Sequence, residues 1–166
     1  LFTIDLDLAS ATARESKLKR ALTPKIIDYG MIVCDCPPNL TIPTQNALAF
    51  STDFVVPVSP DYLSALGVGI LLSRVKELCE DLTHDLNNLG IVISRKGRPA
   101  IHRDEIVTDI RTKLPGLVFR AEISERVAVS EAAAANKSIF QMSDQSAISE
   151  FIEFAKELLI KKGINI

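Results

Sequence analysis

Residues 29–40 read Tyr29-Gly-Met-Ile-Val-Cys-Asp35-Cys-Pro37-Pro38-Asn-Leu40, an apolar run that ends in one carboxylate and two prolines. The apolar run predicts a strand covered by helices on both faces, and the prolines end it because proline has no N–H for a ladder. A carboxylate there lies at the carboxyl edge of a parallel sheet, where open α/β folds place ligands. Asp35 could accept hydrogen bonds from magnesium-bound water at that edge. From spacing alone, a helix cap or a turn explains Asp35 equally well.

Short apolar runs alternate with longer segments of helical period along the rest of the chain. This alternation predicts an α/β fold with a largely parallel sheet and helices on both faces. The expected strands are Phe2–Leu8, Tyr29–Asp35, Phe54–Val58, Leu89–Ser94 and Leu117–Arg120. Helical faces are expected over 71–82, 106–114 and 148–159, the last one after the capping candidates Ser143 and Asp144. No repeat or linker divides the sequence, so we expect residues 1–166 to form a single α/β domain.

Composition narrows the class of protein. The 166 residues are 47% hydrophobic and 24% charged, which suits a globular domain, and the net charge of −2 means that any contact with nucleic acid needs a local basic patch. Three cysteines cannot form a complete disulfide set, so a reducing cytoplasm is expected. The sequence shows no leader and no apolar run near the ~20 residues that a spanning helix needs. Because it begins at Leu1 within a strand-like run, we expect an upstream part of a longer protein.

Several further segments, in the same order, carry a resemblance to a known family. They are Thr41–Leu48, Asp53–Leu72, Leu89–Ser94, Ile123–Ala132 and Asn136–Phe140. Together with Asp35-Cys-Pro37-Pro38, the sequence resembles the ParA family of chromosome and plasmid partitioning ATPases, relatives of MinD. The resemblance covers nearly everything from about residue 18 to 159, and ordered matches on several elements are more specific than one short pattern.

The resemblance implies a P-loop NTPase-like fold of the deviant Walker type, with ATP and Mg²⁺ as cofactors. Asp35 matches the aspartate that supports magnesium, and Pro37 and Pro38 belong to the loop to Thr41 that senses the γ-phosphate. Ser94 matches part of the family's adenine pocket, as does the segment with Ser124, Glu125 and Arg126. The family usually has proline at the position of Ser124. The resemblance also implies an ATP-dependent homodimer, non-specific DNA binding and a ParB-like stimulating partner.

One expected motif is missing from the sequence. It contains neither Gly-x-x-x-x-Gly-Lys-[Ser/Thr] nor the family's Lys-Gly-Gly variant. Without that loop no ring of backbone N–H groups and no lysine holds the phosphates, so we expect no catalytic residue in this chain and no ATP hydrolysis by it alone. The fold is accordingly expected to be incomplete at its amino terminus. The alternative function is a non-catalytic fragment or degenerate paralogue that acts as a binding or dimerisation module.

A basic segment is the candidate DNA contact. Residues 95–103 read Arg-Lys-Gly-Arg-Pro-Ala-Ile-His-Arg, which places Arg95, Lys96, Arg98 and Arg103 in a loop without an acid. Such a patch could bind DNA phosphates without sequence preference, and a solvated loop explains it equally well.

The remaining candidates favour structural explanations. Asp5 and Asp7 fit the alternation of an edge strand better than a metal site. Cys34 and Cys36 would face opposite sides of a strand, so burial is favoured over metal binding. His84 and His102 have no nucleophile at a recognisable spacing and are expected on the surface.

Overall fold

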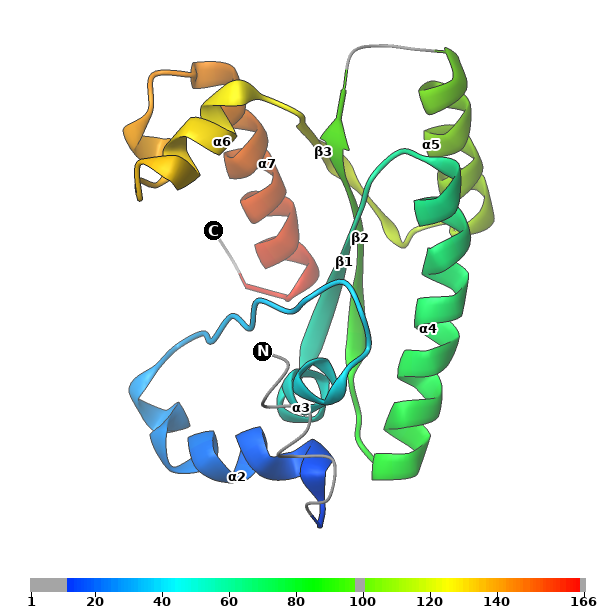
Figure 1. The fold of residues 1–166 in the computed structure, drawn as a ribbon, viewed down its shortest axis with the longest axis vertical. Helices are drawn as coiled ribbons and strands as arrows, with labels where there is room; N and C mark the ends of the chain where they lie inside the picture. The colour runs from blue at the N-terminus through cyan, green and yellow to red at the C-terminus, as the bar shows by residue number, and fades with distance from the viewer. Residues whose placement is uncertain (1–11, 98–100, 165–166) are drawn as a thin grey trace. The chain divides into compact units, whose positions relative to one another are not determined.

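The computed structural model describes residues 12–97 and 101–164, and between residues 42 and 134 its elements alternate between helices and strands, as expected for an α/β fold (Figure 1). The elements are η1 Arg14–Ser16, α2 Lys17–Leu22, η2 Thr23–Asp28, α3 Ile42–Phe50, β1 Asp53–Val58, α4 Tyr62–Leu82, β2 Asn87–Lys96, α5 Ile101–Lys113, β3 Val118–Ser124, α6 Val127–Ala134, η3 Ile139–Gln141 and α7 Gln145–Lys161. The expected strands at Phe54, Leu89 and Leu117 are therefore confirmed, and the last of them runs four residues further than predicted. The strand expected over Phe2–Leu8 and the pair Asp5 and Asp7 lie outside the described residues.

The chain divides into two compact units, each packed mainly within itself. The first unit comprises Leu1–Phe54 and Leu71–Asn87, and the second comprises Val55–Ile70 and Asn88–Ile166. The assignment of residues 1–166 to a single domain stays a prediction.

A three-stranded sheet in the order β1-β2-β3 forms the centre of the second unit, and β2 and β3 run parallel. Side chains alternate along β3, so Phe119 and Ile123 point to one face, where they pack with Leu89 and Val92 of β2. Helix α7 covers this face with Phe151, Phe154 and Leu158. The rings of Phe119 and Phe154 meet edge to face, with centroids 5.2 Å apart.

The opposite face of β2 and β3 is covered by α5 (Figure 1). Ile91 and Ile93 of β2 are fully buried, and α5 contributes the buried residues Ile106, Val107 and Ile110. Helices thus lie on both faces of a sheet with parallel strands, which confirms the predicted fold class.

The free edge of β3 is closed by a carboxylate from α7. The backbone N–H groups of Arg120 and Ala121 donate to the carboxylate of Glu157 at 2.9 Å. The edge of a sheet presents N–H groups without a partner strand, and Glu157 accepts hydrogen bonds from two N–H groups of β3.

The first unit is built around α3, which packs against η1 and α2. Asn46 of α3 joins these elements although its side chain is polar and the residue is only 4% exposed. Its amide nitrogen donates to the carbonyls of Arg14 and Ile42 at 2.7 and 2.9 Å, and its amide oxygen accepts from the N–H of Leu18 at 3.0 Å. All of these groups are satisfied, as a buried amide requires.

One strand prediction is wrong. Tyr29–Asp35 is extended but forms no strand, and the side chains that were expected to be buried are exposed, Met31 to 50% and Val33 to 84%. The physical reason is that a strand is defined by its backbone partners, and within the described residues this segment pairs with none. Asp35 therefore follows an extended segment instead of ending a strand of the described sheet.

Candidate functional site

The candidate site lies where β2 and β3 end. Because the two strands are parallel, their carboxyl ends reach the same edge of the sheet, and Lys96 is in register with Ser124. The N–H of Glu125 donates to the carbonyl of Lys96 at 2.9 Å and continues the ladder past the end of β3. Ser94 and residues 124–126, which the family resemblance assigns to one pocket, are thus brought to a common edge although some thirty residues separate them.

Glu150 of α7 binds the end of β3 from outside the sheet. Its carboxylate accepts from the N–H and the Oγ of Ser124 at 2.9 and 2.8 Å, and from Nη2 of Arg126 at 2.7 Å. The side chain of Glu150 is 21% exposed. Burial raises the pKa of Glu150, but the hydrogen bonds from Arg126 and Ser124 outweigh it, so the net pKa is lowered and the group is ionised at neutral pH.

Two of the basic residues proposed for DNA lie next to carboxylates. Lys96 Nζ is 2.6 Å from Oε2 of Glu122, whose other oxygen accepts from Arg111 of α5 at 2.9 Å. Arg95 Nη2 lies 3.9 Å from Oε1 of Glu125. The segment is free of acids in sequence, but Glu122 of β3 and Glu125, directly after this strand, lie beside it, which no local pattern could reveal.

Of the other two basic residues, Arg103 lies within the described residues and Arg98 does not. Arg103, in α5, is half-buried and lies against Gly97, where an added Cβ would be 2.7 Å from the Nη1 atom of Arg103. Arg98 falls outside the described residues. Their role toward DNA stays a prediction.

In the first unit, Asp35 is exposed and its carboxylate makes no hydrogen bond or ion pair within the described residues. The loop that follows, with Pro37 and Pro38, is held by the first turn of α3. Thr44 Oγ1 donates to the carbonyl of Asn39 at 2.8 Å, and Gln45 Nε2 donates to that of Leu40 at 3.2 Å. The backbone after Asp35 is therefore fixed from one side while the carboxylate stays available.

Asp35 is compatible with magnesium as one acidic contact. Within residues 12–97 and 101–164 no group of three His, Cys, Asp or Glu side chains is arranged to hold a metal. Mg²⁺ commonly uses one or two carboxylates and takes its other ligands from water and phosphate, so a lone available carboxylate fits this mode of binding. The neighbouring thiols do not add a metal site: Cys34 is half-buried, Cys36 is exposed against expectation, and both are free.

Three groups that shape these segments, Glu150, Asn46 and Thr44, have no signal in the sequence. Glu150 stands 24 residues beyond Arg126 on another element, so no spacing signals it. Asn46 and Thr44 lie in the segment Thr41–Leu48, but only their burial shows that they hold backbone groups. His84, expected on the surface, is half-buried with Nε2 2.8 Å from the carbonyl of Ser51, whereas His102 is exposed as expected.

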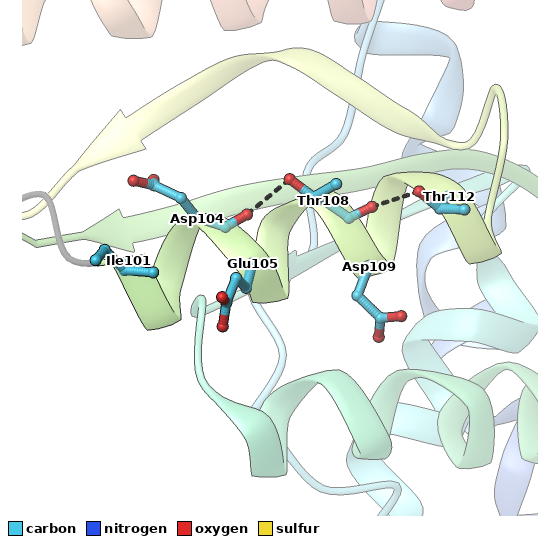
Figure 2. A pocket seen from close by; sticks show the side chains of 6 residues that line it. All are labelled: Ile101, Asp104, Glu105, Thr108, Asp109 and Thr112. Carbon is cyan, nitrogen blue, oxygen red and sulfur yellow. Dashed lines mark hydrogen bonds between the residues drawn. The ribbon is translucent and has the colours of Figure 1, made fainter.

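A shallow depression on α5 offers no comparable site (Figure 2). It is lined by Ile101, Asp104, Glu105, Thr108, Asp109 and Thr112. The hydroxyls of Thr108 and Thr112 donate to carbonyls one turn earlier at 2.8 Å, as the dashed lines show, and Asp109 pairs with Lys113. All six lining residues come from this single helix, and both threonine hydroxyls are satisfied by its own backbone.

Comparison with known proteins settles the family. A family model described as an AAA domain matches residues 1–88, which is more than half of the chain. The chromosome-partitioning ATPase Soj of Treponema pallidum is 30% identical over 173 aligned positions, covering 98% of this chain and 68% of that protein. The chain belongs to the ParA/MinD-type family. The sporulation initiation inhibitor protein Soj of Bacillus subtilis is a further relative of this ParA-type chain, 29% identical over 93% of it.

A solved structure shares the fold of this chain. Cobyrinic acid a,c-diamide synthase from Mycobacterium smegmatis, with bound ADP and magnesium, superposes with a TM-score of 0.72 at 25% identity, over 98% of this chain and 60% of that protein. The ParA-type chain also spans only 61% of the length of Bacillus subtilis Soj. Among the described residues, no helix is long and apolar enough to cross a membrane.

Proposed function

We propose that this chain forms part of a ParA-like partitioning ATPase that binds ATP with Mg²⁺. The observation that carries the proposal is the edge at which β2 and β3 end together, since open α/β folds bind ligands at such an edge and Ser94 and Ser124 lie on the strands that form it. Ser94 and residues 124–126 contact the base in this proposal. Membership of the family and a structural neighbour crystallised with ADP and magnesium support it.

The proposed function assigns the metal to Asp35 and the phosphates to the loop with Pro37 and Pro38. Magnesium, when bound, supplies positive charge that neutralises the phosphates. Asp35 accepts hydrogen bonds from water around the metal, and its exposed carboxylate is available for this. Pro37 and Pro38 limit the backbone freedom of the loop, while Thr44 holds its far end through Asn39.

The test measures ATP binding and turnover by the full-length protein and its Asp35→Ala variant. We expect turnover to fall about 100-fold or more, because the loss of a metal-supporting carboxylate affects the transition state, with the melting temperature unchanged because Asp35 has no partner to lose within the described residues. Asp28→Ala is the matched control, since Asp28 is an exposed acid of the same unit at the end of η2. Turnover by Asp35→Ala equal to that of Asp28→Ala would contradict the assigned role.

DNA binding and assembly are finer parts of the proposal. The protein acts in the cytoplasm at the nucleoid as an ATP-dependent homodimer, binds DNA without sequence preference and responds to a ParB-like partner. Arg95, Lys96, Arg98 and Arg103 contribute to the DNA contact, with Lys96 contributing least because Glu122 already neutralises its charge. Dimerisation doubles the contact and raises avidity.

The test of the DNA contact measures affinity for unrelated duplexes at two salt concentrations with ATP. The variant with alanine at 95, 96, 98 and 103 is expected to bind more weakly and with a shallower salt dependence, because each lost phosphate contact lowers the salt slope by about one. Lys96→Ala alone is expected to change little. The double variant Arg74→Ala, Lys76→Ala is the control, since both side chains are exposed cations of α4 outside the patch. Equal affinity and slope for the control and the fourfold variant would refute the patch.

A further inference from the structure

Glu150 is the shared acceptor for the side chains at the end of β3. Its two oxygens accept from the N–H and Oγ of Ser124 and from Nη2 of Arg126, all at 2.7–2.9 Å, with Nε of Arg126 at 3.5 Å. Charge-assisted bonds of this length are the stronger ones in proteins. A single side chain of α7 therefore fixes two positions on either side of Glu125.

The position of the Ser124 N–H explains why an acceptor is needed. Successive N–H groups of a strand point to opposite sides, and the next one, of Glu125, donates to Lys96 of β2. The N–H of Ser124 therefore points away from the sheet, and without Glu150 it would have no partner at a partly buried site. Arg126 is held further by Asp144, whose Oδ2 lies 3.9 Å from its Nη1.

We propose that Glu150 is a positioning residue, which holds residues 124–126 in the conformation that receives the nucleotide base without itself contacting the nucleotide. This inference rests on the proposed ATP binding and adds to it the residue that orders one wall of the site. Glu150 raises the affinity for the nucleotide in this proposal. A segment that is disordered before binding loses conformational entropy when the base binds, whereas a segment that Glu150 already holds in order does not.

The test compares Glu150→Gln with Glu153→Gln in the full-length protein, measuring KM for ATP, kcat and the melting temperature. Glutamine keeps the size of Glu150 but turns one acceptor into a donor that faces Ser124 or Arg126. We expect KM to rise about tenfold with kcat within about twofold of wild type. Glu150→Asp, which keeps the charge, is expected to raise KM less. Glu153 is the matched control, since it is an exposed acid on the same helix.

A second background separates positioning from general stability. Ser124→Pro removes both serine donors and fixes the backbone φ by its ring, so the contact with Arg126 is the remaining one, within the described residues, through which Glu150 holds the segment. In the Ser124→Pro background, Glu150→Gln is expected to change KM by less than about threefold. The effects of the two substitutions are then not additive, as expected of residues that act through one another.

The outcomes are distinct. A rise in KM for Glu150→Gln that shrinks beside proline supports the inference. A KM equal to that of Glu153→Gln, or a loss confined to kcat and melting temperature, overturns it even where the wild type binds ATP normally. A wild-type protein that binds no ATP refutes the proposed function, and this inference with it.

Discussion

Replacing Asn46 by alanine should destabilise the first unit far more than its size suggests. The side chain makes three hydrogen bonds, to Arg14, Leu18 and Ile42, in a position that is 4% exposed. Each bond contributes about 0.5–1.5 kcal/mol, and the groups left behind are buried, so the expected loss is about 2–4 kcal/mol of the free energy of unfolding. Asn46→Asp should cost at least as much as alanine, because a carboxylate oxygen then faces two carbonyl oxygens.

Urea unfolding followed by far-ultraviolet circular dichroism measures this loss, since the sequence has no tryptophan. Gln45→Ala is the control: this neighbour of Asn46 on α3 loses one bond of 3.2 Å at a half-buried position, so the expected cost is below about 1 kcal/mol. Amide exchange at Leu18 should accelerate in both Asn46 variants and not in the control. If Asn46→Asp proves as stable as wild type, the bonding pattern assigned to Asn46 is refuted.

Three other predictions concern the second unit. Phe119→Ala should cost about 3–5 kcal/mol in urea unfolding, because the ring is fully buried against α7, and a cost below about 1 kcal/mol would contradict that packing. Gly90→Ala should cost about 2 kcal/mol or more, because Gly90 has φ +137° and a Cβ there would lie 2.3 Å from the Leu117 carbonyl, whereas Gly67→Ala, in open space on α4, should be neutral or stabilising. Burial raises the pKa of Glu122, but hydrogen bonds from two cations outweigh burial, so the net pKa of Glu122 lies below the ordinary value of 4.5. The stability that ionised Glu122 contributes is complete above pH 4.5 and is lost as the pH falls through the lower pKa of the folded state. Glu122→Gln should therefore flatten the pH dependence of the unfolding midpoint below about pH 4.5, and an unchanged slope would contradict the assignment.

The elements that depend on local pattern were predicted correctly. Phe54, Leu89 and Leu117 each open a short apolar run, and each run forms a strand. The helix after Asp144 follows from its three- and four-residue apolar spacing, and Asp144 does cap it by accepting from the N–H of Ala147 at 3.0 Å. These features depend on neighbours in sequence, which is why the sequence sufficed.

The features that failed or were missed depend on groups distant in sequence. The run ending at Asp35 is as apolar as the true strands, but a ladder needs a partner strand, and apolar pattern does not supply one. The basic segment 95–103 contains no acid in its sequence, but this did not predict its surroundings. Glu122 and Glu125 approach it only through the pairing of β2 with β3. For the site, the sequence indicated Ser94 and Ser124, whereas the acceptor that organises Ser124 could be seen only in three dimensions.

The contact of Glu157 with the edge of β3 favours extension of the sheet on its other side. The amides of Arg120 and Ala121 already donate to the carboxylate of Glu157, so a strand from another molecule that pairs at these residues has to displace this side chain, which protects this part of the edge against intermolecular β-pairing. Within the described sheet the opposite border is β1. We therefore expect a further strand that joins the sheet to dock along β1.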